Sequence, residues 1–241
     1  MPVFEDEFVY TMMAYDALCV MPDKVRDIAD TTRWGEDLKK RTMFSANYQQ
    51  RNPRVNQSLS PVLEAGLLQP MRNENVVEAH AFDIHQRQGD LPKKVVEACQ
   101  RCKQQLPAFV SGPGGFEAAL SSMGTLAHRV IDIWNPFNLT INDKIAPVAQ
   151  RFMESVKGHI LDLPFLWGHL GSDDDSFMRH TPYMDLMATT IEAERRFDKF
   201  FEPIANGYLV GNGFPAVRSV IEEWYNATVN ALARVWLFCC Q

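Results

Sequence analysis

Residues 127–138 read Ala-His-Arg-Val-Ile-Asp-Ile-Trp-Asn-Pro-Phe-Asn, and this stretch decides how we interpret the fold. It continues an apolar segment that begins at Phe116, and the spacing predicts one long helix that the Asn-Pro pair ends. His128 and Asp132 are four residues apart, so they leave the same face of that helix one turn apart. An imidazole and a carboxylate at this spacing can hold one transition-metal ion.

Helical periodicity also dominates the rest of the chain. Apolar residues recur at helical spacing over residues 8–21, 23–40, 75–85, 92–106, 147–160, 182–201 and 215–238, with one short helix at 61–68. No stretch shows the alternation that is typical of strands, and we find no internal repeat. The sequence therefore predicts an all-α fold, packed as a multi-helix bundle.

The length of the chain and the positions of its helix-breaking residues predict one helical domain over residues 1–241. Residues 44–75 are rich in Pro, Asn and Gln with weak periodicity, so we expect a loop-rich insertion there. Residues 111–115 read as a flexible break, and residues 168–176 as a polar loop. The helices that follow form a C-terminal extension from about residue 168.

The composition of the chain disfavours some classes of binding partner and indicates a cellular location. The formal net charge of the 241 residues is -6, which disfavours binding to duplex nucleic acid. No apolar run approaches the length of a transmembrane segment, and nothing near Met1 reads as a signal peptide. The five cysteines are odd in number and clustered, which favours reduced thiols and a cytoplasmic location. Cys99 and Cys102 form a lone C-x-x-C without a second pair, so we expect neither a closed zinc site nor a redox motif there.

Several segments, in order, carry a family resemblance. Residues 118–136, with Gly124, His128, Asp132 and Pro136, resemble the central "A-x-x-x-L-G-x-x-x-H-x-x-x-D-x-x-x-P-x-H" helix of the zinc-dependent phospholipase C and single-strand nuclease superfamily. The other matching segments are His80-Ala81-Phe82-Asp83 for a ligand His, residues 10–22 for the first helix, Trp34-Gly35-Glu36-Asp37 for an acidic ligand, and Arg151-Phe152-Met153-Glu154 for the last Glu. The resemblance implies a helical bundle of the phospholipase C and nuclease type.

The chain departs from this family at several ligand positions. Tyr10, Asn138 and Gln150 stand where the family has His, and the family's free N-terminal Trp has no counterpart. Phenols and amides are poorer zinc ligands than imidazole, so two of the family's three metal sites look dismantled.

What remains implies a single divalent metal ion, with zinc favoured. Its ligands would be His80, His128, Asp132 and an acid from Glu36 or Asp37. An iron or manganese ion with mixed oxygen and nitrogen donors is an alternative.

Two functions follow from this reduced set of ligands. The first is a metal-dependent phosphoesterase-like hydrolase acting on a small-molecule or phosphodiester substrate, with Asp132 as the catalytic residue and one ion acidifying a water. The second is a non-catalytic relative that serves as a binding or interaction module. The sequence leaves the oligomeric state open.

Each candidate also has a purely structural interpretation. His128 and Asp132 could form a hydrogen-bonded pair packed in the core, and His80 could lie on a helix surface or be partly buried. Asp83 and His85 are expected to be solvated, and Glu154 to be an ordinary surface acid.

Overall fold

A computed structural model describes residues 4–20, 61–73, 79–105, 113–163, 182–211 and 213–239. Over these ranges it contains seven α-helices, three short 3-10 helices and no strand, which confirms the all-α bundle. The α-helices are α1 (Glu7–Val20), α4 (Pro61–Asn73), α5 (Leu91–Gln105), α6 (Pro113–Trp134), α7 (Ala146–His159), α8 (Pro182–Leu209) and α9 (Gly213–Cys239). The predicted helix at 23–40 and the polar loop at 168–176 lie outside the described residues.

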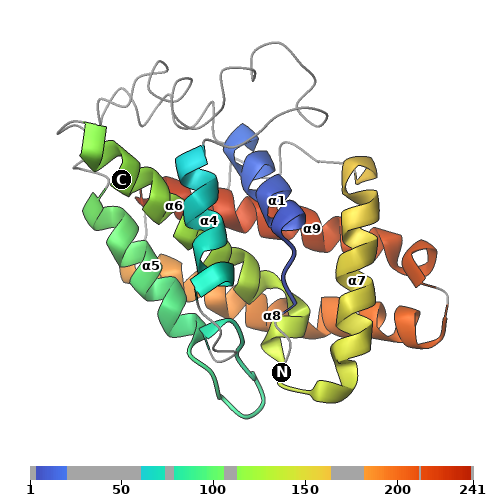
Figure 1. Cartoon of the computed structure of the whole chain (residues 1–241). Helices are drawn as coiled ribbons and strands as arrows, with labels where there is room; N and C mark the ends of the chain where they lie inside the picture. Colours follow the sequence, from blue (N-terminus) through green and yellow to red (C-terminus); the bar gives the residue numbers. More distant parts are fainter. Residues whose placement is uncertain are drawn as a thin grey trace.

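α6 is the central helix. From Ala119 to Trp134 its apolar side chains are buried around the whole circumference, as expected for a helix enclosed by others. α4, α5, α1, α8 and α9 all contact it. In Figure 1, α4, α1 and α7 stand side by side in front, and α6, α8 and α9 run across them behind. The helix begins at Pro113, inside the segment that we predicted as a flexible break, because Pro is favoured in the first turn of a helix.

The last two helices complete the core. Two indole groups of α9 donate hydrogen bonds to carbonyl oxygens of α6, Trp224 to Trp134 over 2.7 Å and Trp236 to Met123 over 3.0 Å. Phe197 and Phe200 of α8 are buried with them, so this aromatic cluster packs in the core as its helical spacing predicts. No helix among the described residues is long and apolar enough to cross a membrane.

Two glycines let α4 and α6 approach until their backbones touch. A Cβ added to Gly124 of α6 would overlap the Leu63 carbonyl oxygen of α4, and one added to Gly66 would overlap the Ser121 carbonyl oxygen. The Thr125 hydroxyl fixes the crossing with a 3.2 Å hydrogen bond to the Gly66 carbonyl. α4 therefore packs as a full helix inside the region that we expected to be rich in loops, and it is longer than predicted.

Gly124→Ala should destabilise the fold by about 2–3 kcal/mol, because the new methyl group must push α4 and α6 apart. The free energy of unfolding, measured by urea denaturation, checks this. Gly158→Ala in α7 is the matched control, since nothing lies within 4 Å of a Cβ there. It should stabilise the protein by about 0.5–1 kcal/mol through the helix preference of Ala. Equal effects of the two substitutions would contradict the close crossing.

Candidate metal centre

His128 and Asp132 lie together on one face of α6, as their spacing predicts. His128 Nε2 is 3.1 Å from Asp132 Oδ2, and both side chains are fully buried. Neither residue faces solvent, so the carboxylate must be neutralised from within the protein.

His80 reaches the same point from the segment between α4 and α5. Its Nδ1 lies 3.0 Å from Asp132 Oδ2 and 3.1 Å from His128 Nε2. His80 is only 1% exposed, so the alternative of a helix-surface or partly buried His was wrong. Three side chains from two distant segments therefore converge as the sequence predicts.

The prediction of a helix up to His85 was also wrong over the described residues 79–85. The backbone N–H groups of Phe82 and Ile84 instead bond to the carbonyls of Asn138 and Leu139, over 2.8 and 3.3 Å. These carbonyls belong to the 3-10 helix Pro136–Leu139, which directly follows α6. The pairing holds the His80 segment against the end of α6 and directs the imidazole into the core.

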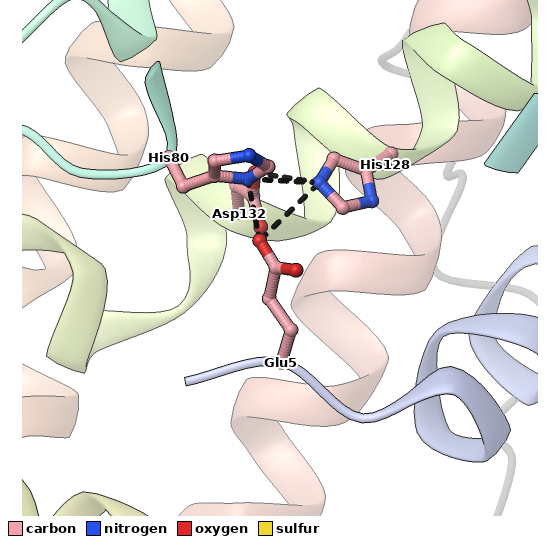
Figure 2. Close-up of side chains that lie close together, drawn as sticks. All are labelled: Glu5, His80, His128 and Asp132. Carbon is pink, nitrogen blue, oxygen red and sulfur yellow. Dashed lines mark hydrogen bonds and ion pairs between the residues drawn. The ribbon is translucent and has the colours of Figure 1, made fainter. Parts of the chain in front are cut away.

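Glu5 completes the cluster and was not predicted. Its Oε1 lies 2.5 Å from His80 Nδ1 and 3.3 Å from His128 Nε2 (Figure 2). Glu5 comes from the short segment ahead of α1. The predicted acidic ligands, Glu36 and Asp37, lie outside the described residues.

Neighbouring residues fix the position of this N-terminal segment. Asn135 donates a 2.9 Å hydrogen bond to the Phe4 carbonyl. The Asp6 carboxylate accepts from the first N–H groups of α1 at 3.0 and 3.1 Å, as an N-cap does, and also pairs with Lys157 at 3.0 Å. Capping by Asp6 could be anticipated from the sequence, but nothing in the sequence indicates that Glu5 points inward.

The four ligand atoms surround a gap of the size of one ion. The atoms are Glu5 Oε1, His80 Nδ1, His128 Nε2 and Asp132 Oδ2, all within 4.8 Å of one another. Five of the six distances between them are 2.5 to 3.3 Å. A tetrahedral zinc ion with bonds of 2.0–2.1 Å would give distances of about 3.3 Å between its ligand atoms. The five distances are at or below that value, and this group could hold a metal ion.

Hydrogen bonds alone satisfy this cluster poorly. His80 Nδ1 carries either one proton or one lone pair, yet it faces two carboxylate oxygens and a second imidazole nitrogen. Glu5 Oε1 is buried and has no partner with hydrogen-bond geometry among the described residues, despite its 2.5 Å contact. The outer ring nitrogens, His80 Nε2 and His128 Nδ1, also have no hydrogen-bond partner among the described residues. Each ring therefore makes its polar contacts through the nitrogen that points to the centre of the cluster.

The two carboxylates of the cluster favour a positive charge beside them. Burial alone would lower the pKa of His80, but Asp132 and Glu5 outweigh it and raise that pKa to about 9. The same two carboxylates raise the pKa of His128 against its burial. Burial would raise the pKa of Asp132, but the two imidazoles hold it below its ordinary value. Two carboxylates attract either protons on these imidazoles or one divalent cation.

Tyr10 and Asn138 contact the Asp132 carboxylate on the side away from the two imidazoles. The Tyr10 hydroxyl donates a 2.7 Å hydrogen bond to Asp132 Oδ1, and Asn138 Nδ2 lies 3.5 Å from the same oxygen. Burial, with the charges of Asp132 and Glu5, raises the pKa of Tyr10 well above its ordinary value, so it remains a donor. These contacts orient the carboxylate and leave Oδ2 for the centre.

Arg129 is the cation nearest to the centre among the described residues. It is 2% exposed, and its Nη1 donates to the Ala79 carbonyl over 3.0 Å. The same atom lies 3.3 Å from His80 Nδ1 and 3.7 Å from Asp132 Oδ2. The guanidinium therefore compensates part of the negative charge of the two carboxylates.

Gln150 and Glu154, the α7 residues compared above with family ligands, lie at the surface. Gln150 and Glu154 of α7 are exposed and bond to each other over 2.9 Å, as expected for an ordinary surface acid. Both line a hollow of about 420 Å³ whose wall also includes Glu5. Glu5 thus separates the buried centre from a surface hollow.

Asp83 was expected to be solvated, and this was wrong. It is 4% exposed, and its carboxylate accepts backbone hydrogen bonds from His85, Gln86 and Ile141 over 2.9, 2.7 and 3.2 Å. Burial would raise the pKa of Asp83, but these bonds hold it below its ordinary value. Asp83 is thus not a ligand; it ties the segment of His80 to the residues that follow α6. His85 is exposed, as expected.

No family model matches the chain, and neither the curated proteins nor the solved structures contain a match. The resemblance to the phospholipase C and nuclease superfamily therefore rests on the residues quoted above.

Asp83→Ala should lower the free energy of unfolding by about 2 kcal/mol near neutral pH, because three backbone donors lose their acceptor. The pKa of Asp83 is depressed in the folded state, so its contribution is present above its ordinary pKa of about 3.9 and is lost as pH falls. The difference from wild type in urea denaturation should therefore shrink below about pH 4. Gln86→Ala, an exposed change in the same turn, should stay within about 0.5 kcal/mol. A pH-independent difference would contradict this role of the carboxylate.

Proposed function

We propose that this protein is a metal-dependent phosphoesterase-like hydrolase with a single divalent ion, zinc favoured, held by His80, His128, Asp132 and Glu5. One observation carries the proposal: four ligand atoms from three segments lie close together, and five of the six distances between them are 2.5 to 3.3 Å. Two imidazole nitrogens together with two carboxylate oxygens are a set of ligand atoms that suits zinc. Glu5 takes the place of the acid that we first assigned to Glu36 or Asp37.

The position of Glu5 favours a catalytic over a purely structural centre. Catalytic zinc sites have three protein ligands and one open position, whereas structural sites have four protein ligands. Here His80, His128 and Asp132 are anchored in the bundle, but Glu5 lies on a short segment beside the surface hollow. If Glu5 withdraws, three protein ligands and one exchangeable position remain.

The charge balance favours an anionic substrate. A divalent ion together with Arg129 exceeds the two carboxylates by one positive charge. A phosphoester carries the complementary negative charge, and burial strengthens the attraction. When bound, such an ion supplies Lewis acidity toward a phosphoryl oxygen and acidifies a water.

The chain's own residues prepare the site for this chemistry. Tyr10 holds Asp132 by its Oδ1, so the other oxygen is directed at the centre. Arg129 adds a fixed positive charge 3.3 Å from His80 Nδ1. The buried walls of α6 keep bulk water from these groups, which preserves the strength of their interactions.

A second candidate is a non-catalytic relative of the same fold, acting as a binding or interaction module. The hydrogen bond from Tyr10 to Asp132 and the nearby Arg129 favour it, because they stabilise the carboxylate without an ion. The two candidates differ in metal content.

Metal content separates the two candidates directly. After dialysis against chelator and reloading with zinc, wild type should retain about one equivalent per chain, measured by mass spectrometry of the element. His128→Ala should retain less than about a tenth of an equivalent, because the centre loses a buried ligand. His159→Ala, an exposed imidazole on α7, should bind like wild type. Less than about half an equivalent on wild type would rule out the metal centre.

Glu5→Ala tests the exchangeable ligand. Zinc should still bind with a dissociation constant raised at least about tenfold, because three ligands remain. Hydrolysis of bis(p-nitrophenyl) phosphate by the zinc-saturated variant should persist at the wild-type rate or above, since the fourth position is open. Glu154→Ala, which changes another acid of the same hollow, should leave zinc affinity unchanged. Loss of hydrolysis in zinc-saturated Glu5→Ala would contradict this role.

A further inference from the structure

Two cysteines that are 140 residues apart meet where α5 contacts α9. Cys99 lies in the middle of α5, and Cys239 is the last residue of α9. Their sulfur atoms are 3.2 Å apart, and both side chains are buried. The Cys239 thiol also lies 3.9 Å from the Cys99 carbonyl. The sulfur atom in close contact with Cys99 is thus that of Cys239, from the other end of the chain.

We propose that Cys99 and Cys239 are a site of reversible disulfide formation, which joins α5 to the end of α9 when the protein meets a low-molecular-weight disulfide such as oxidised glutathione. The bond is about 2.05 Å long, so the sulfur atoms must approach by about 1.2 Å. Cys239 can make this movement because it occupies the terminal turn of a helix, where the backbone opens most readily.

The reaction is a balanced thiol–disulfide exchange. The Cys239 thiolate, exposed when the helix end opens, attacks one sulfur of oxidised glutathione and releases one glutathione thiolate. Cys99 then attacks the Cys239 sulfur of the mixed disulfide and releases the second glutathione. Two electrons pass from the protein thiols to the oxidant, and the two thiol protons end on the two released glutathiones.

The surroundings of the pair set its reactivity. The adjacent Cys239 thiol, together with burial, raises the pKa of Cys99 far above its ordinary value, so Cys99 is a poor first nucleophile. Cys239 at the helix end therefore reacts first. Lys103, one turn beyond Cys99, lies 4.0 Å from the centre of the Phe238 ring. This cation–π contact brings the end of α9 back to α5 after opening.

The crosslink would restrain the centre of the bundle. It closes a loop from residue 99 to residue 239 that contains α6, α7, α8 and α9, and α5 itself packs on α6. A long closed loop removes more freedom from the unfolded chain than a short one. Oxidation should therefore raise the melting temperature by roughly 5–10 °C.

Peptide mapping of the full chain tests the site. The protein is incubated with oxidised glutathione, its remaining thiols are alkylated, and trypsin is added. Cleavage after Lys94 and Arg101 places Cys99 in a peptide of its own, separate from Cys102, and cleavage after Arg234 releases the peptide that contains Cys239. We expect the peptide of residues 95–101 linked to the peptide that begins at Val235, with fragment ions that assign the bond to Cys239 and not to Cys240.

Matched variants on α5 complete the test. Cys102→Ala, a buried change in the same helix, should keep both the linked peptide and the rise in melting temperature, whereas Cys99→Ala should lose both. The proposal is overturned if wild-type Cys99 remains alkylated, if it is found only with glutathione, or if it links to Cys102. The map of wild-type protein decides the question even if Cys99→Ala fails to fold.

Discussion

A fully buried carboxylate, that of Asp132, is the constraint on which the rest of this structure depends. An ionised group cannot remain inside a helical bundle unless positive or hydrogen-bonding groups surround it. Tyr10 covers one of its oxygens, and two imidazoles approach the other. These partners come from α1, α6 and the segment before α5, so the packing of three distant parts of the chain is organised around a single charge.

The sequence was most informative about α6. Its apolar periodicity predicts a buried helix, and the four-residue spacing of His128 and Asp132 places them on one face, as the structure confirms. Both properties follow from helix geometry alone. Helix ends were less predictable, because residues 113–115 look like a linker but form the first turn of α6.

Contacts between distant segments could not be predicted from local sequence patterns. The position of His80 depends on backbone pairing with the residues after α6, and no periodicity encodes that pairing. Glu5 is one of three neighbouring acids, and contacts on both sides of it, from Asn135 to Phe4 and from Lys157 to Asp6, hold it toward the centre. The burial of Asp83 could not be predicted from its neighbours in the sequence. One of its three hydrogen-bond donors is Ile141, which lies 58 residues further along the chain.

Anomalous X-ray scattering at the zinc absorption edge, on crystals of the zinc-loaded protein, tests the central claim most directly. The account predicts one strong peak enclosed by His80 Nδ1, His128 Nε2 and Asp132 Oδ2, at about 2.0–2.2 Å from each. A peak elsewhere on the molecule, or none at this point with Arg129 and the imidazoles closing the gap through hydrogen bonds, would contradict it.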